Sequence, residues 1–205
     1  MSYKIIVARY NENIEWLNSE MSNCIIYNKG DALNICNEIL LNNVGRESET
    51  YLHYIITNYD NLPDVVVFTQ ARISDHKRRD NIDYLIRIKN TALRHSKSQN
   101  FFRHNDVRRN MHWRKDWNLR SNGYYLKDNY KHNKPIIFIE WFKQNIDIHY
   151  PNPICIYRNA IFAVKKEKIL NKPLEYYKRL ILEVNHNVNP TEGHFFERSW
   201  YYIFS

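Results

Sequence analysis

Asp64-Val65-Val66-Val67-Phe68-Thr69-Gln70 is the most strand-like stretch of the chain. It holds four consecutive apolar residues, three of them β-branched, and then turns polar at Thr69 and Gln70. A short apolar run without alternation is typical of a strand buried on both faces, as in a parallel sheet covered by helices. Lys4–Ala8 has the same character, so we expect a second buried strand there.

Helical and strand patterns alternate outward from this stretch. The other elements that we expect are a short helix over Ile14–Leu17, a strand over Cys24–Tyr27, a helix from Asn43 through Ile56, a helix over Asn81–His95, a strand or helix start over Pro135–Phe142, a strand pair over Ile154–Val164, a helix over Glu167–Glu183 and a closing segment over Glu192–Phe204. This alternation predicts an α/β fold whose central mixed, mostly parallel sheet is flanked by helices.

Length and composition predict one domain over residues 1–205, with residues 96–134 as an irregular insertion rich in basic and aromatic residues. No apolar run approaches the roughly 20 residues that span a bilayer, so we expect no membrane span. We expect no signal peptide, and the three scattered cysteines are typical of reduced core residues. A cytoplasmic location follows from these features.

The positive charge is concentrated in the middle of the chain. Residues 72–134 hold 17 Lys and Arg against 6 Asp and Glu, whereas the remainder holds 13 against 16. Basic residues interleaved with aromatics suit nucleic acid, and they equally suit a nucleotide diphosphate or an anionic acceptor. No helix-turn-helix, zinc or RNA-recognition signature supports specific nucleic-acid binding.

Polar residues follow each predicted strand of the first half. They are Ala8-Arg9-Tyr10 after the first strand, Asn28-Lys29 after the second, and Gln70-Ala71-Arg72 with Asp75 after the strand at 64–70, while Gly45-Arg46 opens a helix whose free N–H groups favour an anion. Ligands of parallel sheets bind at the carboxyl ends of the strands. The sequence therefore predicts a diphosphate crevice, with Asp75 and either His76 or His194 holding a divalent cation.

The segment Glu192-Gly193-His194-Phe195-Phe196-Glu197-Arg198-Ser199-Trp200 places two carboxylates, a histidine and an arginine among aromatics. Charges next to large apolar groups indicate side chains held near a buried surface, where general bases and metal ligands occur. The alternative is a helix whose aromatics dock on the core while Glu197 and Arg198 pair locally.

Several of these phrases together resemble a family of small glycosyltransferases, the closest being the N-terminal domain of a multidomain chlorovirus protein. The matching phrases are Val7-Ala8-Arg9-Tyr10-Asn11-Glu12, Tyr27-Asn28-Lys29-Gly30, Asn43-Val44-Gly45-Arg46-Glu47, Tyr51-Leu52-His53-Tyr54-Ile55-Ile56, Asn58-Tyr59-Asp60-Asn61-Leu62-Pro63-Asp64, Phe162-Ala163-Val164 and the segment at 192–200. The resemblance implies a single GT-A (Rossmann-like) domain, a UDP-sugar donor, a divalent metal such as Mn²⁺ or Mg²⁺, and a viral protein of the host cytoplasm.

Together with the resemblance, the positions of these residues after the predicted strands suggest a role for each. The uridine would be held by Ala8, Arg9, Tyr10 and Asn28, the phosphates would meet Lys29 and Arg46, and the donor side would be completed by Gln70 and Arg72. Asp75 would be the metal ligand or catalytic acid centre, with His194 as second ligand. The general base would be either Glu192 or Glu197. The chain departs from the family by carrying the single acid Asp75 where an Asp-x-Asp is usual. Trp113, Trp117, Tyr124 and Tyr125 would form an acceptor platform.

The function expected from this resemblance is inverting, metal-assisted transfer of a sugar from a UDP-sugar to a glycan or glycoprotein acceptor. Two alternatives stay open at this point. One is a catalytically degenerate domain that binds a nucleotide sugar without chemistry, which the missing second acid favours. The other is a nucleic-acid-binding protein that uses the basic middle segment.

Overall fold

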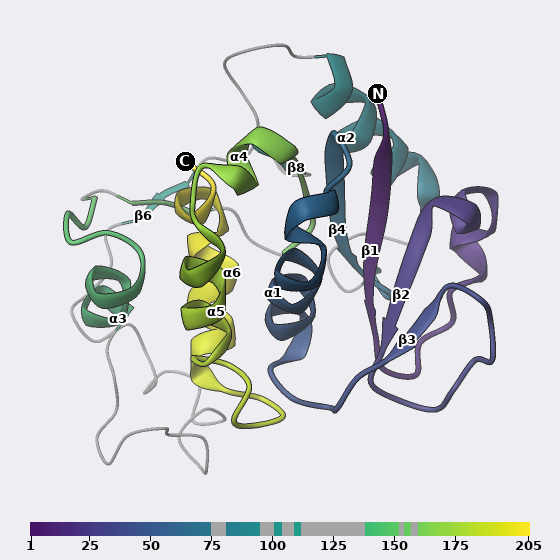
Figure 1. The fold of residues 1–205 in the computed structure, drawn as a ribbon, viewed down its shortest axis with the longest axis horizontal. Helices are drawn as coiled ribbons and strands as arrows, with labels where there is room; N and C mark the ends of the chain where they lie inside the picture. Colours follow the sequence, from purple (N-terminus) through teal and green to yellow (C-terminus); the bar gives the residue numbers. More distant parts are fainter. Residues whose placement is uncertain (75–80, 95–100, 104–108, 112–137, 152–153, 157–159) are drawn as a thin grey trace.

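The computed structural model describes residues 1–74, 81–94, 101–103, 109–111, 138–151, 154–156 and 160–205. The described residues form a six-stranded sheet with the strand order β3-β2-β1-β4-β8-β5 (Figure 1). Its strands are β1 (Tyr3–Arg9), β2 (Cys24–Asn28), β3 (Glu38–Leu40), β4 (Val65–Gln70), β5 (Phe101–Arg103) and β8 (Phe162–Lys165). The predicted α/β class is confirmed.

The sheet is mixed and mostly parallel, as predicted. Strands β3, β2, β1 and β4 run in one direction, whereas β8 runs antiparallel to both β4 and β5. A second, two-stranded sheet pairs β6 (Arg109–Met111) with β7 (Ile154–Ile156). The strand pair expected over Ile154–Val164 is therefore two strands, β7 and β8, that pair with different partners.

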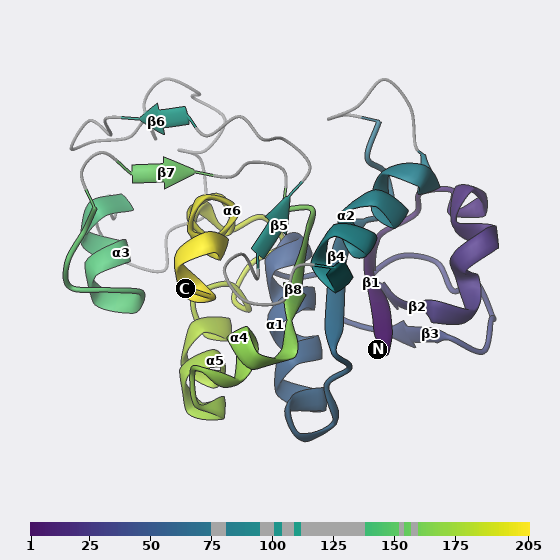
Figure 2. The ribbon, with the colours of Figure 1, turned by 90° about the horizontal axis from the view of Figure 1, so that it is seen from above.

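Helices cover both faces of the main sheet (Figure 2). The helices of the described residues are η1 (Glu15–Asn23), α1 (Arg46–Asn58), η2 (Tyr59–Asn61), α2 (Ile82–Arg94), α3 (Phe138–Asn145), α4 (Lys166–Leu170), α5 (Leu174–Ile181) and α6 (Thr191–Ile203). Helix α1 packs against α5 and α6, and α2 packs against β4, β8 and η1. The single helix expected over Glu167–Glu183 is divided, because Pro173 ends the first piece and caps the second.

Alternate residues of the central strands enter two separate cores. Ile6, Val66 and Phe68 lie in the core shared with α1, α5 and α6. Val7 and Val67 lie in the core shared with η1 and α2. Both faces are thus covered by apolar side chains, which explains why these strands read as continuous apolar runs.

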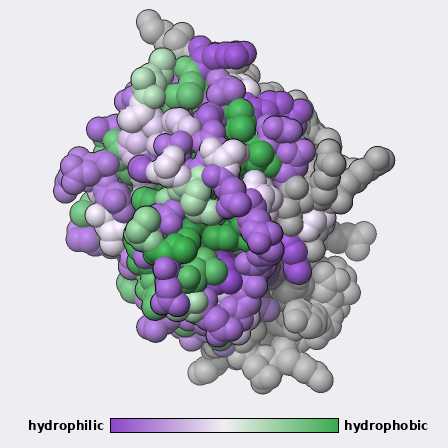
Figure 3. All heavy atoms as spheres, turned by 90° about the vertical axis from the view of Figure 1, so that its right-hand side faces the viewer, coloured by the Kyte–Doolittle hydropathy of each residue, from purple (hydrophilic) through white to green (hydrophobic). Residues whose placement is uncertain are grey.

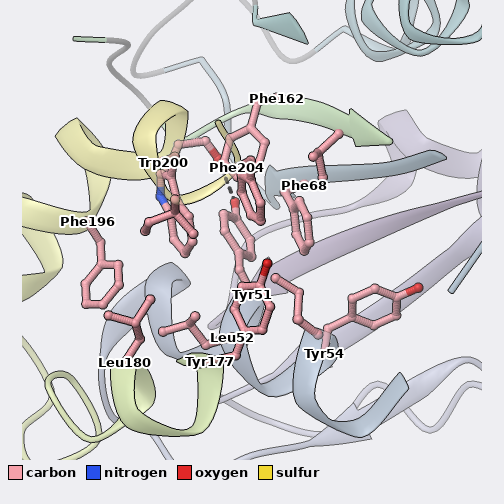
Figure 4. Packing of buried hydrophobic residues seen from close by; sticks show 14 of the residues in the cluster. Tyr51, Leu52, Tyr54, Phe68, Phe162, Tyr177, Leu180, Phe196, Trp200 and Phe204 are labelled. Carbon is pink, nitrogen blue, oxygen red and sulfur yellow. Dashed lines mark hydrogen bonds between the residues drawn. The ribbon is translucent and has the colours of Figure 1, made fainter. Parts of the chain in front are cut away.

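Aromatic rings join α1 and α6 to the sheet (Figure 4). The Trp200 ring centroid lies 5.8 Å from that of Tyr51 and 5.5 Å from that of Phe162. The Tyr51 hydroxyl donates a 2.8 Å hydrogen bond to the carbonyl of Ala160, just before β8. These contacts hold both helices against β8.

Strand β3 is an edge of the main sheet. Its residues Ile39 and Leu40 are among the exposed large apolar side chains of the protein. Figure 3 shows the molecule from the side on which β2 and β3 lie in Figure 1, and apolar atoms form a patch there within a mostly hydrophilic surface. The short length of β3 limits the pairing surface that this edge presents.

Candidate functional site

The strand order reverses between β1 and β4. From β1 the chain passes through η1 on one face to β2, and from β3 it passes through α1 on the other face to β4. In open α/β sheets such a reversal leaves a crevice beyond the carboxyl ends of the two strands, where ligands bind. These ends lie at the lower edge of the sheet in Figure 1, where α1 and α6 begin.

A pocket of about 700 Å³ lies at this reversal point. Its volume is within the range of small-molecule sites. The lining residues are Ala8, Arg9, Tyr10, Glu12, Lys29, Asn43, Arg46, Glu47, Thr50, Gln70, Arg72, Val188 and Asn189. Seven of the residues that we expected on the donor side therefore line one pocket, and they come from the ends of β1, β2 and β4 and from the start of α1.

Arg9 and Asn28 support the pocket from beneath. The Arg9 guanidinium donates to the carbonyls of Glu12, Tyr10 and Asp31 and to the Asn28 side-chain oxygen, at 2.8–3.1 Å. Asn28 is fully buried and donates in turn to Glu38 and to the carbonyl of Asp31. Both side chains hold the loops after β1 and β2 together and so support the pocket, while the uridine contact expected of them stays a prediction.

Gly30 shows how closely these two loops approach. A Cβ atom at this position would lie 1.9 Å from the carbonyl oxygen of Tyr10. Any side chain would therefore force the loops apart and widen the floor of the pocket.

Lys29 also supports the pocket wall. Its Nζ lies 2.7 Å from Glu49 Oε2 and donates to the carbonyls of Val44 and Arg46, so all three N–H donors of the ammonium are matched by acceptors. Burial lowers the pKa of Lys29, although the Glu49 carboxylate raises it. Lys29, which was expected to meet phosphate, thus takes part in a buried ion pair that secures the start of α1.

Arg46 stands at the junction of α1 and α6. It follows Gly45, and both residues have left-handed backbone angles, with φ values of 66° and 51°. This geometry turns the chain sharply into α1 at a cost of about 1–3 kcal/mol for the arginine. The Arg46 side chain is 40% exposed. Its guanidinium lies 3.6 Å from Glu47, 3.4 Å from Asn189 and 3.2 Å from His194 Nε2.

The remaining donor-side residues lie at the ends of β1 and β4. Ala8 and Gln70 are paired across the two strands, and the Ala8 carbonyl accepts from Ala71 N at 2.9 Å. Arg72 is exposed at the pocket. The Tyr10 side chain is about half exposed, as is Val188 from the loop before α6, so the pocket has an apolar rim.

His194, Glu192 and Glu197 lie on α6 next to this pocket and are not among its lining residues. Glu192 is buried, 3.9 Å from His186 Nε2. Glu197 is 3.5 Å from Arg198 and 4.0 Å from His194 Nδ1. The local pairing of Glu197 with Arg198, which the sequence left open, is present.

The expected metal site cannot be assembled from the described residues. Asp75 and His76 lie outside them, as do Trp113, Trp117, Tyr124 and Tyr125 of the expected acceptor platform. Within the described part of the chain no group of three His, Cys, Asp or Glu side chains is placed to hold a metal ion. His194 Nε2 faces the Arg46 guanidinium, which is a poor setting for a cation ligand.

Sequence reasoning missed several residues of the pocket. Glu12, Glu47, Asn43, Thr50, Val188 and Asn189 line it. Asn189 and Val188 belong to a loop far along the chain from the strands that form the pocket. The signal for Glu12 and Glu47 was their position inside the phrases that begin at Val7 and Asn43.

Fold and pocket together define an α/β protein with a ligand pocket at the carboxyl edge of its parallel strands. The chain belongs to the family described as protein of unknown function (DUF3431), whose model matches residues 5–205. Neither a curated protein nor a solved structure matches the chain. Among the described helices, none has the length and apolar character needed to cross a membrane.

Proposed function

We propose that this protein is a glycosyltransferase of the GT-A type that uses a UDP-sugar donor. The observation that carries this proposal is the pocket at the reversal point between β1 and β4, where Arg46 and Arg72 come from two different elements. Such a crevice is where mononucleotide-binding sheets hold their ligands. The seven expected donor-side residues that line the pocket, five of them in the phrases that carry the resemblance, support the same proposal.

The two exposed arginines are the proposed diphosphate contacts. Arg9 and Lys29 are largely buried against protein acceptors, whereas Arg46, beside Glu47 and His194, keeps 40% of its side chain exposed and Arg72 is exposed. Guanidinium groups bind phosphate oxygens through paired, charge-assisted hydrogen bonds. The half-exposed Tyr10 ring offers a face on which a nucleobase stacks.

Transfer would break the bond between the anomeric carbon and the diphosphate oxygen and form a bond from that carbon to an acceptor hydroxyl of a glycan or glycoprotein. The hydroxyl proton passes to a carboxylate, and the departing UDP takes the electron pair. Arg46 and Arg72 stabilise the charge that develops on UDP. Glu192 and Glu197 stay the proposed alternatives for the base, with Glu197 the more exposed of the two at 20%.

A divalent metal, Mn²⁺ or Mg²⁺, stays a prediction from the resemblance and from Asp75. When bound in GT-A proteins such a cation supplies positive charge to the diphosphate. His194 does not fit as its ligand, because the imidazole faces Arg46. We therefore assign no step to a metal here.

One observation favours the catalytically degenerate alternative. Neither base candidate is among the residues that line the pocket. A domain that binds a UDP-sugar without transferring it would share the same pocket and the same arginines.

Release of UDP from a panel of UDP-sugars, with and without Mn²⁺, tests the proposal. We expect release from at least one donor, and we expect Arg46→Ala to lower the rate about 10- to 100-fold, because a hydrogen bond to a charged group contributes about 1.5–3 kcal/mol. Lys178→Ala is the control, since this exposed lysine pairs with Glu175 at the surface of α5. Binding without release supports the degenerate alternative, and the absence of both contradicts the proposal.

A further inference from the structure

The pocket contains carboxylates as well as cations. Besides its arginines and Lys29, it is lined by Glu12 and Glu47. A carboxylate repels phosphate oxygens, so a site that bound only a diphosphate would be weakened by one. The presence of two carboxylates therefore needs a structural or a chemical reason.

Glu12 has a structural reason. Its Oε2 accepts a 2.7 Å hydrogen bond from the backbone N–H of Tyr10, and its carbonyl accepts from Arg9 Nε at 2.9 Å. Both contacts close the turn that follows β1. The carboxylate of Glu12 is thus part of the loop that shapes the pocket.

Glu47 has a partial structural reason, because it lies in the first turn of α1, where a helix N-terminus favours a carboxylate, and its charge acts on Lys29. Within the described part of the chain, however, its carboxylate accepts no close hydrogen bond. Its side chain is nine-tenths buried, and its ion pair with Arg46 Nε spans 3.6 Å, which is longer than a hydrogen bond. An ionised carboxylate only accepts, and its two oxygens can take bonds from two neighbouring hydroxyl groups. Charge-assisted O–H···O⁻ bonds of this kind are short and strong.

Thr50 is a second polar residue of the pocket lining on this side. It follows Glu47 by three residues in α1, so the two side chains lie on one face of the helix. Thr50 is buried at the pocket, and its Oγ1 has no hydrogen-bond partner among the described residues. A buried hydroxyl without a partner is costly unless a ligand supplies one.

We propose that Glu47, assisted by Thr50, forms a polyol subsite that accepts hydrogen bonds from adjacent hydroxyl groups of the ligand. This inference rests on the proposed function, in which the ligand carries a ribose diol and a sugar. Arg46 then lies between the two parts of the pocket, because its exposed guanidinium contacts phosphate in the proposed complex and its Nε lies 3.6 Å from Glu47 Oε2.

Calorimetric titrations with pyrophosphate, UDP and UDP-glucose test the subsite. Pyrophosphate has no carbon-borne hydroxyl, UDP adds the ribose diol and UDP-glucose adds the hexose. We expect Glu47→Gln to weaken binding of a hydroxyl-bearing probe about 10- to 100-fold and to leave pyrophosphate affinity unchanged or higher. A loss already seen with UDP identifies the ribose as the partner, whereas a loss seen only with UDP-glucose identifies the sugar.

Two further variants separate charge from geometry. Glu47→Asp keeps the charge and shortens the side chain, so it should lose the hydroxyl bonds while pyrophosphate affinity stays unchanged. Glu175→Gln, at an exposed position of α5, removes the same charge elsewhere and should change none of the three affinities. Circular dichroism measures whether each variant is folded. If Glu47→Gln is unfolded, Glu47→Asp alone serves as the test.

The outcomes distinguish the two proposals. If wild type binds UDP-glucose and both Glu47 variants bind it equally well, the polyol subsite is overturned while the proposed function stands. A uniform loss for all three probes also overturns the subsite, because it indicates a collapsed pocket. If wild type binds neither UDP nor UDP-glucose, the subsite and the proposed function both fall.

Discussion

Trp200→Ala is expected to lower the free energy of unfolding by about 3–5 kcal/mol, the range for removing a large aromatic side chain from a core. Trp200 is 1% exposed. Its ring lies 5.4 Å from that of Phe196 and 5.9 Å from that of Phe204, centroid to centroid, in addition to its contacts with Tyr51 and Phe162. Urea denaturation followed by circular dichroism measures the loss, with an unchanged slope indicating that the native fold is kept.

Trp200→Phe is the matched control for this variant. The phenyl ring keeps most of the aromatic contacts, and it removes a buried indole N–H that has no hydrogen-bond partner among the described residues. We expect a clearly smaller loss than for alanine. A loss below about 1 kcal/mol for Trp200→Ala, which is typical of an exposed site, would contradict the packing of α6 described above.

Lys29→Met is expected to cost about 3–5 kcal/mol of stability, because it leaves the Glu49 carboxylate buried without its cation. The two side chains are 5% and 9% exposed, and the variant also deprives the carbonyls of Val44 and Arg46 of their donor. Thermal and urea unfolding measure the loss. Since the pair secures the start of α1, UDP affinity should fall as well.

The double variant Lys29→Met with Glu49→Leu tests whether the loss comes from the unpaired Glu49 charge. It removes both charges at once, so it should be more stable than Lys29→Met alone. A double variant that is less stable than the single one would show that the carboxylate of Glu49 is satisfied by other groups, such as His53 Nδ1 at 3.9 Å.

The buried parallel strands could be predicted because their pattern is local. Residues 65–68 are apolar throughout, since one core covers Val66 and the other covers Val67. The antiparallel insertion of β8 between β4 and β5 could not be read in the same way. Pairing between Val66 and Val164, nearly a hundred residues apart, leaves no periodic trace in either segment.

The candidate site shows a similar division. The rule that ligands bind beyond the carboxyl ends of strands was enough to place Arg9, Lys29 and Arg46 around one pocket. It did not reveal which of these cationic side chains are bound by acceptors of the protein itself. The acceptors of Arg9 include the Asp31 carbonyl and those of Lys29 include Glu49, and only the folded chain brings these groups together.

A UDP titration followed by amide NMR tests the central claim, that the pocket between β1 and β4 is a nucleotide-diphosphate site. We predict that the largest shifts fall at three places along the chain: Ala8–Tyr10, Gly45–Thr50 and Gln70–Arg72. Each of these segments contributes residues to the pocket lining. No shifts at millimolar UDP, or shifts confined to the basic residues of 96–134, would contradict this account.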